Sequence, residues 1–148
     1  MADVLQIQDL RAWYGAAQVL HGTHLSIGEG EAVALIGRNG SGRSTLAKAI
    51  MGFVRCEGVM RYRGKSLIGL RPYRIARLGI GYVPETRDVF PALTVRENLL
   101  LGEKKVTRFK IDDTYDVFPA LRERANVKRE ALRRIARCVS ARRAYFDN

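Results

Sequence analysis

The residues between Gly37 and Thr45 could bind phosphate. Three glycines in this stretch free backbone N–H groups to turn toward an anion, where a side chain would block the approach. The hydroxyl of Ser44 could ligate the magnesium ion that accompanies a nucleoside triphosphate. A glycine-rich turn that binds no ligand is the alternative. The candidate phosphate-binding residues are Gly37, Asn39, Gly40, Ser41, Gly42, Arg43, Ser44 and Thr45.

The stretch departs from the usual phosphate-binding loop at one position. Arg43 precedes Ser44 where a lysine is usual. Arginine keeps the positive charge but replaces a compact ammonium with a longer, planar fork. We therefore expect the attraction for phosphate to survive, and the fit around the β- and γ-phosphates to change.

The sequence on either side predicts the elements that would position this loop. The apolar run over residues 32–36 predicts a buried strand, and residues 46–51 predict a helix that ends at Gly52. Strand, glycine-rich loop and helix form the context that a phosphate-binding loop requires. The N-terminus of the helix would add its dipole and its unpaired N–H donors at the same point.

Further strands and helices are expected around this core. Alternating apolar residues over 4–10 and 19–27 predict antiparallel strands ahead of the loop, with a turn at 28–31. Later in the chain we expect a strand over 58–64 with a turn at Gly64, a helix-like stretch from Pro72, a strand over 80–84, and a helix over 94–101 whose Thr94 and Glu97 form a capping box.

Composition narrows the class of protein. The 148 residues are 47% hydrophobic and 28% charged, which indicates one soluble globular domain. No stretch approaches the roughly 18 to 20 apolar residues that a membrane helix needs, and the first residues lack the features of a signal peptide. Cys56 and Cys138 are isolated and lack metal-ligand spacing, which indicates a reducing compartment, by default the cytoplasm.

Positive charge is concentrated toward the end of the chain. The net charge is +11, and residues 103–148 carry 13 basic and 7 acidic side chains. A basic segment can bind nucleic acid, anionic lipid or a phosphate-rich partner, or it can be a solvated helix face. No aromatic stacking pattern or DNA-binding motif accompanies the charge, so nucleic acid is not the expected partner.

Residues 3 to about 125 resemble the ATP-binding subunit of an ABC transporter, of the kind that serves branched-chain (hydrophobic) amino-acid importers. Beside the glycine-rich loop, the resemblance rests on residues 12–15, 19–22, 29–31, 74–85 and 90–98, in the order of the family. It implies an α/β fold, with a P-loop nucleotide-binding core and an N-terminal antiparallel β subdomain, incomplete at the C-terminus. It also implies ATP and Mg²⁺ as cofactors and ATP hydrolysis that drives transport.

The resemblance assigns roles to two residues outside the loop. Tyr14 matches the aromatic residue that stacks on adenine; a half-buried core tyrosine is the alternative. Glu85 stands where most members have a glutamine that reaches the magnesium ion, and a carboxylate can ligate Mg²⁺ directly. An ordinary surface carboxylate is the alternative for Glu85.

The resemblance also implies partners and a location. Residues 85–98 would form the surface that contacts the membrane-spanning permease subunits. A second ATP-binding subunit, identical or different, would complete a dimer. The protein would then lie in the cytoplasm, on the inner face of the plasma membrane.

Three features of the family are missing after Ala125. The chain contains no Leu-Ser-Gly-Gly signature, no apolar strand that ends in Asp-Glu, and no switch histidine; His21 and His24 precede the loop and are expected in a strand. We therefore expect residues 1–125 to form a partial ATP-binding domain. Residues 126–148 would be a basic tail, helical or disordered, of the kind that a truncation, deletion or reading-frame change produces. No catalytic residue is assigned, and a nucleotide-binding chain without turnover remains an alternative.

Overall fold

The computed structural model describes residues 3–85, 90–101 and 110–128. It consists of two compact units, Met1–Leu78 and Gly79–Asn148, and each is described by itself. The tail predicted over residues 126–148 lies outside the described residues from 129 onward. No helix among the described residues is long and apolar enough to cross a membrane.

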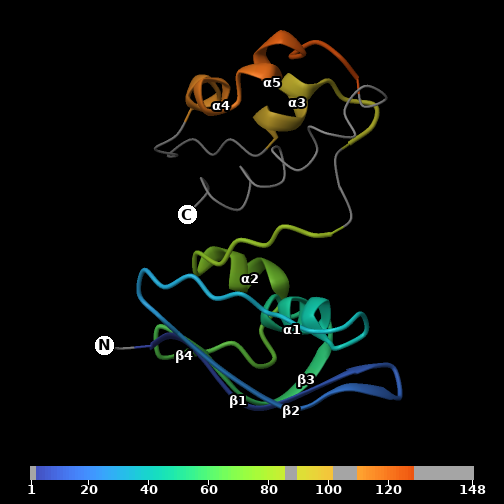
Figure 1. Cartoon of the computed structure of the whole chain (residues 1–148), viewed down its shortest axis with the longest axis vertical. Helices are drawn as coiled ribbons and strands as arrows, with labels where there is room; N and C mark the ends of the chain where they lie inside the picture. The colour runs from blue at the N-terminus through green and yellow to red at the C-terminus, as the bar shows by residue number, and fades with distance from the viewer. Residues whose placement is uncertain (1–2, 86–89, 102–109, 129–148) are drawn as a thin grey trace. The chain divides into compact units, whose positions relative to one another are not determined.

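The first unit is built on a four-stranded antiparallel sheet (Figure 1). Its strands are β1 (Asp3–Tyr14), β2 (Ala17–Gly28), β3 (Arg55–Tyr62) and β4 (Lys65–Ser66), in the order β2-β1-β3-β4. The strands expected before the loop and over 58–64 are therefore confirmed, and so is the position of His21 and His24 in a strand. Arg63 and Gly64 form the turn between β3 and β4 and have positive φ angles of 46° and 78°.

A bulge in β1 changes which of its side chains are buried. Leu5 and Ile7 are buried before the bulge and Leu10 and Ala12 after it, so the alternation moves by one residue at Asp9. Asp9 has a φ of 47°, in the left-handed region. The shift places the even-numbered residues of the second half of β1 on the face that packs inward.

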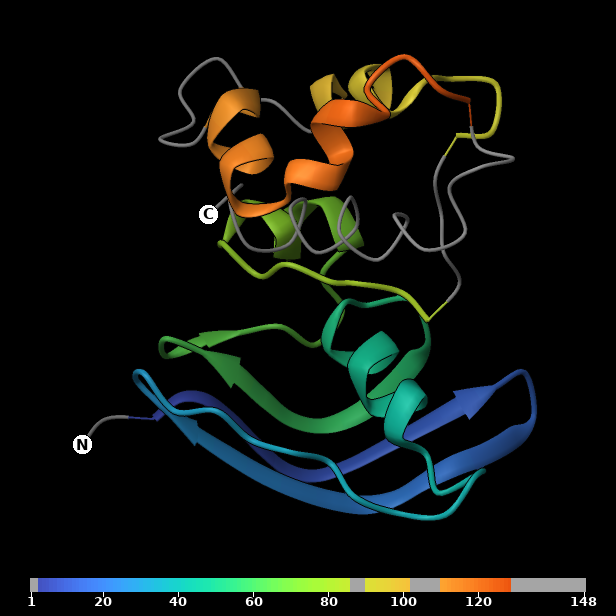
Figure 2. The ribbon, with the colours of Figure 1, turned by 45° about the horizontal axis from the view of Figure 1, so that its top comes forward.

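Helix α1 (Arg43–Ile50) packs on the face of the sheet formed by β1, β2 and β3 (Figures 1 and 2). Leu46 and Ala49 are its buried apolar residues. The helix ends as expected at Gly52, which has a φ of 70°. Two backbone bonds close this end: Gly52 N donates to Ala49 O at 3.0 Å and Phe53 N donates to Lys48 O at 2.9 Å. Helix α2 (Pro72–Arg77) begins at the proline, as predicted.

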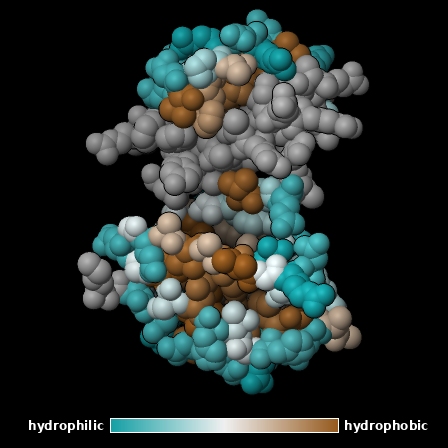
Figure 3. Space-filling view, viewed as in Figure 1, coloured by the Kyte–Doolittle hydropathy of each residue, from teal (hydrophilic) through white to brown (hydrophobic). Residues whose placement is uncertain are grey.

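The strand predicted over residues 32–36 is wrong. Figure 2 draws this segment as a plain tube between β2 and α1, and all residues from 31 to 40 are exposed, with Ile36 at 92%. An apolar run becomes a buried strand only when neighbouring strands bond to its backbone on both edges. No strand in the described part of the chain pairs with it. Its apolar side chains therefore remain at the surface, and Figure 3 shows hydrophobic side chains gathered on the visible face of this unit.

The strand predicted over residues 80–84 is also wrong, for the same reason. These residues are irregular, and within the described ranges no strand bonds to them.

The described helices of the second unit are α3 (Val95–Leu100), α4 (Ile111–Val117) and α5 (Pro119–Glu123). Their apolar residues form a small core of Val95, Leu99, Tyr115 and Leu121. The predicted capping box is confirmed: Glu97 N donates to Thr94 Oγ1 at 3.2 Å, and Thr94 N donates to Glu97 Oε2 at 2.7 Å.

Candidate phosphate-binding site

The glycine-rich loop folds back on itself between Gly37 and Gly42. Ser41 N donates to Arg38 O at 3.1 Å, which closes a turn. A Cβ atom at Gly37 would lie 2.6 Å from Ser41 Oγ, so a larger residue there would displace the Ser41 side chain. Gly40 has a φ of 83° and open space around the position of a Cβ. A backbone that turns back on itself, with open space at Gly40, suits an anion that approaches the backbone N–H groups.

Helix α1 begins directly at this turn. Gly42 is its N-cap, with a φ of 86°, and a Cβ there would lie 2.7 Å from a Leu20 side-chain carbon. Gly42 O accepts the first helical hydrogen bond, from Leu46 N at 2.8 Å. The first N–H groups of a helix have no partner within the helix, so the positive end of the α1 dipole and these N–H groups lie at the loop.

Arg43 reaches back over the loop. Its Nη2 atom lies 3.5 Å from Asn39 Oδ1, at the outer limit of a hydrogen bond, and both side chains are exposed. A contact of this length is weak, so an incoming phosphate could replace Asn39 as the partner of the guanidinium.

The two hydroxyl residues after Arg43 have different environments. Ser44 is partly exposed in the first turn of α1, as a magnesium ligand would need to be. Thr45 is 6% exposed and belongs to the interior of the unit. Its position is better suited to support the start of the helix than to hold a ligand with its side chain.

Tyr14 lies on the side of β1 that faces α1. It follows Leu10 and Ala12 in the alternation that the bulge at Asp9 sets, and its side chain is 44% exposed. Lys48 Nζ lies 5.8 Å from the centroid of its ring. Sequence reasoning missed Lys48, although its spacing of four residues from Ser44 places both on one side of α1.

Glu85 is exposed and belongs to the second unit, so its role at the magnesium ion stays a prediction. Among the described residues, no three or more His, Cys, Asp or Glu side chains form a metal-binding cluster. The role of Ser44 as a ligand of the magnesium ion likewise stays a prediction.

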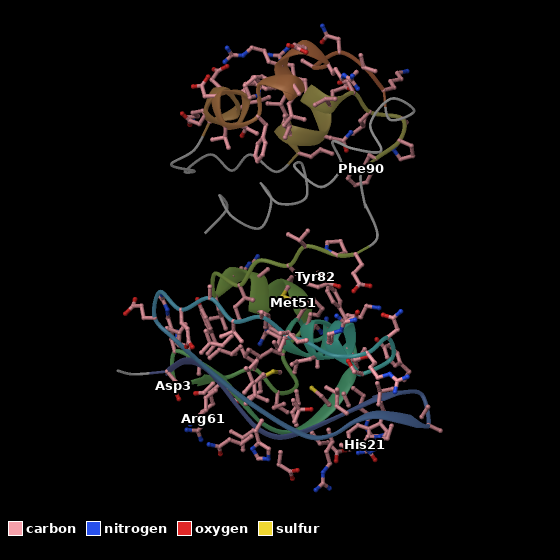
Figure 4. All side chains as sticks on the ribbon, viewed as in Figure 1. Asp3, His21, Met51, Arg61, Tyr82 and Phe90 are labelled. Carbon is pink, nitrogen blue, oxygen red and sulfur yellow. The ribbon has the colours of Figure 1, made fainter. Side chains whose placement is uncertain are left out.

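The segment predicted to contact the permease is organised by a buried side chain. Asn98, 7% exposed, bonds to the backbone of residues 90–94; its Nδ2 donates to Leu93 O at 3.2 Å and to Thr94 O at 2.9 Å. Phe90, the first of the residues bonded by Asn98, is 51% exposed and is labelled in Figure 4. Sequence reasoning placed Asn98 in the segment without a role.

The loop, the start of α1 and Ser44 together fit the triphosphate of a nucleotide with its Mg²⁺ ion. The loop would supply backbone donors, Arg43 would supply a positive charge, and Ser44 would supply an oxygen ligand. A bound Mg²⁺ ion would screen the charge of the phosphates. Such an arrangement could bind and orient a triphosphate.

Comparison with known proteins agrees with this chemistry. The family described as ABC transporter matches residues 20–142. The high-affinity branched-chain amino acid transport ATP-binding protein of Pseudomonas aeruginosa is 42% identical over 100 residues, which are 67% of this chain and 43% of that protein. The xylose/arabinose import ATP-binding protein of Sulfolobus acidocaldarius is 35% identical over 105 residues, which are 70% of this chain and 42% of that protein. The chain thus spans less than half the length of either relative.

Solved structures share the fold. An ATP-binding cassette of an ABC transporter superposes with a TM-score of 0.75 at 23% identity, over 100% of this chain and 66% of that chain. An ATP-binding subunit of an ABC transporter superposes with a TM-score of 0.73 at 28% identity, over 95% of this chain and 61% of that chain. The predicted α/β fold with a P-loop core and an antiparallel β subdomain is therefore confirmed.

Proposed function

The chain belongs to the ABC transporter family, and from this premise we propose that it binds Mg-ATP as part of an ATP-binding subunit. The observation that carries the proposal is the turn of residues 37–42, whose left-handed glycines lead directly into the N-terminus of α1. Arg43 and Ser44 would contact the phosphates and the magnesium ion, and Tyr14 would stack on the adenine.

Calorimetry of Mg-ATP with the purified 148-residue chain tests this proposal. We expect saturable binding that Ser44→Ala weakens and that EDTA reduces. If a folded sample shows no heat of binding at millimolar Mg-ATP, the chain is not a nucleotide binder. Gly64→Ala is a suitable control, because Gly64 lies in the turn between β3 and β4, outside the loop and α1.

The transported substrate is a narrower proposal. The relative from Pseudomonas serves branched-chain amino acids and the one from Sulfolobus serves xylose and arabinose. The higher identity to the first supports a branched-chain amino-acid importer. In such an assembly the subunit would pair with a second ATP-binding subunit and with membrane-spanning permease subunits. It would then lie on the cytoplasmic face of the plasma membrane, with residues 85–98 against the permease.

A nucleotide-binding role without turnover is the second candidate. It is supported by the lack of a Leu-Ser-Gly-Gly sequence and of an Asp-Glu pair after an apolar strand in residues 1–148. A measurement of phosphate release by the purified chain distinguishes a subunit that hydrolyses ATP from a chain that binds nucleotide without turnover. Hydrolysis well above background that disappears in Ser44→Ala would exclude the non-catalytic role, and binding without phosphate release would support it.

A further inference from the structure

We propose that Lys48 is a positioning residue, which holds the ring of Tyr14 in the orientation that stacks on a nucleotide base. The inference rests on the proposed function, because it requires a nucleotide at residues 37–45. It gives a role in base binding to a residue of α1 that lies outside the glycine-rich loop.

The contact between the two side chains has the geometry of a cation–π interaction. Lys48 Nζ lies 5.8 Å from the ring centroid, inside the range of about 6 Å in which an ammonium is attracted to an aromatic face. The Tyr14 side chain is still 44% exposed. Because an aromatic ring has two faces and the ammonium lies over one, a base would stack on the other.

Both side chains extend from backbone that is held in place. Lys48 lies in the last turn of α1, and its carbonyl accepts the hydrogen bond from Phe53 N at 2.9 Å that closes the helix end. Tyr14 is the last residue of β1 and pairs with Ala17 across a two-residue turn. The ammonium therefore restricts a ring whose own backbone is already fixed, which lowers the entropy that base stacking would cost.

The neighbouring residue of β1 offers a matched control. Trp13 has its own cation, because the guanidinium carbon of Arg55 lies 5.4 Å from its ring centroid. Trp13 and Tyr14 are adjacent in an extended strand and point to opposite faces of the sheet. Arg55→Met thus removes one positive charge and one cation–π contact, as Lys48→Met does, on the face away from α1. It also removes an exposed ion pair with Glu57 at 2.8 Å, a type of contact that contributes little to stability.

The experiment compares two ligands that share a magnesium-bound triphosphate, Mg-ATP and inorganic Mg-tripolyphosphate, by calorimetry. We expect Lys48→Met to raise the Kd for Mg-ATP about three- to fivefold, the size of an exposed cation–π contact. The Kd for Mg-tripolyphosphate should not change. Lys48→Arg should bind like the parent, Arg55→Met should bind both ligands like the parent, and Lys48→Met should have no effect in a Tyr14→Leu background.

Three results would overturn the inference. Equal weakening of both ligands would mean that Lys48 acts on the phosphates or on the fold. Tighter binding of Mg-ATP by Lys48→Met would mean that the ammonium occupies the face that the base needs. An effect that persists in Tyr14→Leu would mean that Lys48 acts without the ring. Failure of the parent chain to bind either ligand would instead overturn the proposed function, and the inference with it.

Discussion

The side chain of Asn98 bonds both backbone groups of Phe90. Its Oδ1 accepts from Phe90 N at 2.9 Å and its Nδ2 donates to Phe90 O at 3.1 Å. Because Asn98 lies in α3 and Phe90 lies eight residues earlier, the amide ties the exposed aromatic residue to the helix. The position of Phe90 is thus set by a side chain that is itself buried.

Removal of this amide should loosen the segment before α3. Asn98→Ala removes the side-chain partner of Phe90 N and Leu93 O, while Phe90 O keeps Leu93 N at 3.2 Å and Thr94 O keeps the backbone N of residue 98 at 3.0 Å. We therefore expect a loss of about 1–3 kcal/mol in the free energy of unfolding of the second unit. Hydrogen exchange should show faster exchange at the Phe90 amide and no change in β1. Arg96→Ala, an exposed change on the same helix, is the control; equal exchange in the two variants would contradict the role of Asn98.

Acid should weaken the start of α3. Hydrogen bonds from the backbone N–H and the hydroxyl of Thr94, with a smaller contribution from the charge of Lys128, lower the pKa of Glu97 below its ordinary value of 4.5. A lowered pKa in the folded state means that the stabilisation is present above pH 4.5 and is lost as the pH falls through the folded pKa. An NMR titration of the Glu97 carboxyl measures the pKa directly. In Glu97→Gln the exchange rates at the start of α3 should no longer change over this pH range; a change that persists would assign it to another group.

A side chain at Gly58 should destabilise the first unit. Gly58 lies opposite the bulge of β1 with a φ of 116°, and a Cβ there would overlap the carbonyl oxygen of Asp9. We expect Gly58→Ala to cost about 2–4 kcal/mol in urea unfolding, through strain and forced displacement of the bulge. At Gly64 the φ is 78° and nothing lies within 4 Å of a Cβ, so Gly64→Ala should cost only about 1 kcal/mol. Similar losses at both positions would show that the close approach to Asp9 does not matter.

Lysine at position 43 should bind nucleotide more tightly. A compact ammonium fits between the β- and γ-phosphates better than a planar guanidinium, so Arg43→Lys should strengthen Mg-ATP binding by about 1–2 kcal/mol. Arg43→Ala should weaken it, and calorimetry measures both. If Arg43→Lys binds no better than the parent, arginine already fits the loop. If Arg43→Ala also binds like the parent, residues 37–45 do not form a phosphate-binding site.

The features that the sequence predicted correctly depend on neighbours along the chain. Helix α1, its end at Gly52 and the capping box of Thr94 and Glu97 are local, since each is set by residues at most a few positions apart. The strand expected over 32–36 failed because its formation depends on distant strands that bond to it. The bulge at Asp9 has no clear sequence signal, because an aspartate in the left-handed region looks like any other polar residue between apolar ones.

In the candidate site, too, local features could be predicted from the sequence, and features that depend on packing could not. The composition and spacing of residues 37–45 predicted a curled loop at the start of a helix, and the structure has one. The burial of Thr45 and the contact of Lys48 with Tyr14 could not be predicted, because they depend on how α1 packs on the sheet. Arg43 and Asn39 share one side of the loop for a similar reason, since the turn of the backbone brings them together.

Ahead of the glycine-rich loop, residues 31–38 are exposed and form no regular structure, so they do not anchor that end of the loop. At the other end, α1 holds Arg43 and the residues after it in a helix. A bound triphosphate would therefore have to restrict the backbone ahead of Gly37, and part of the attraction would be used for that ordering. Affinity should then be coupled to local order: any interaction that pairs the backbone of residues 32–36 would tighten nucleotide binding without touching the nucleotide, and nucleotide would in turn favour that pairing.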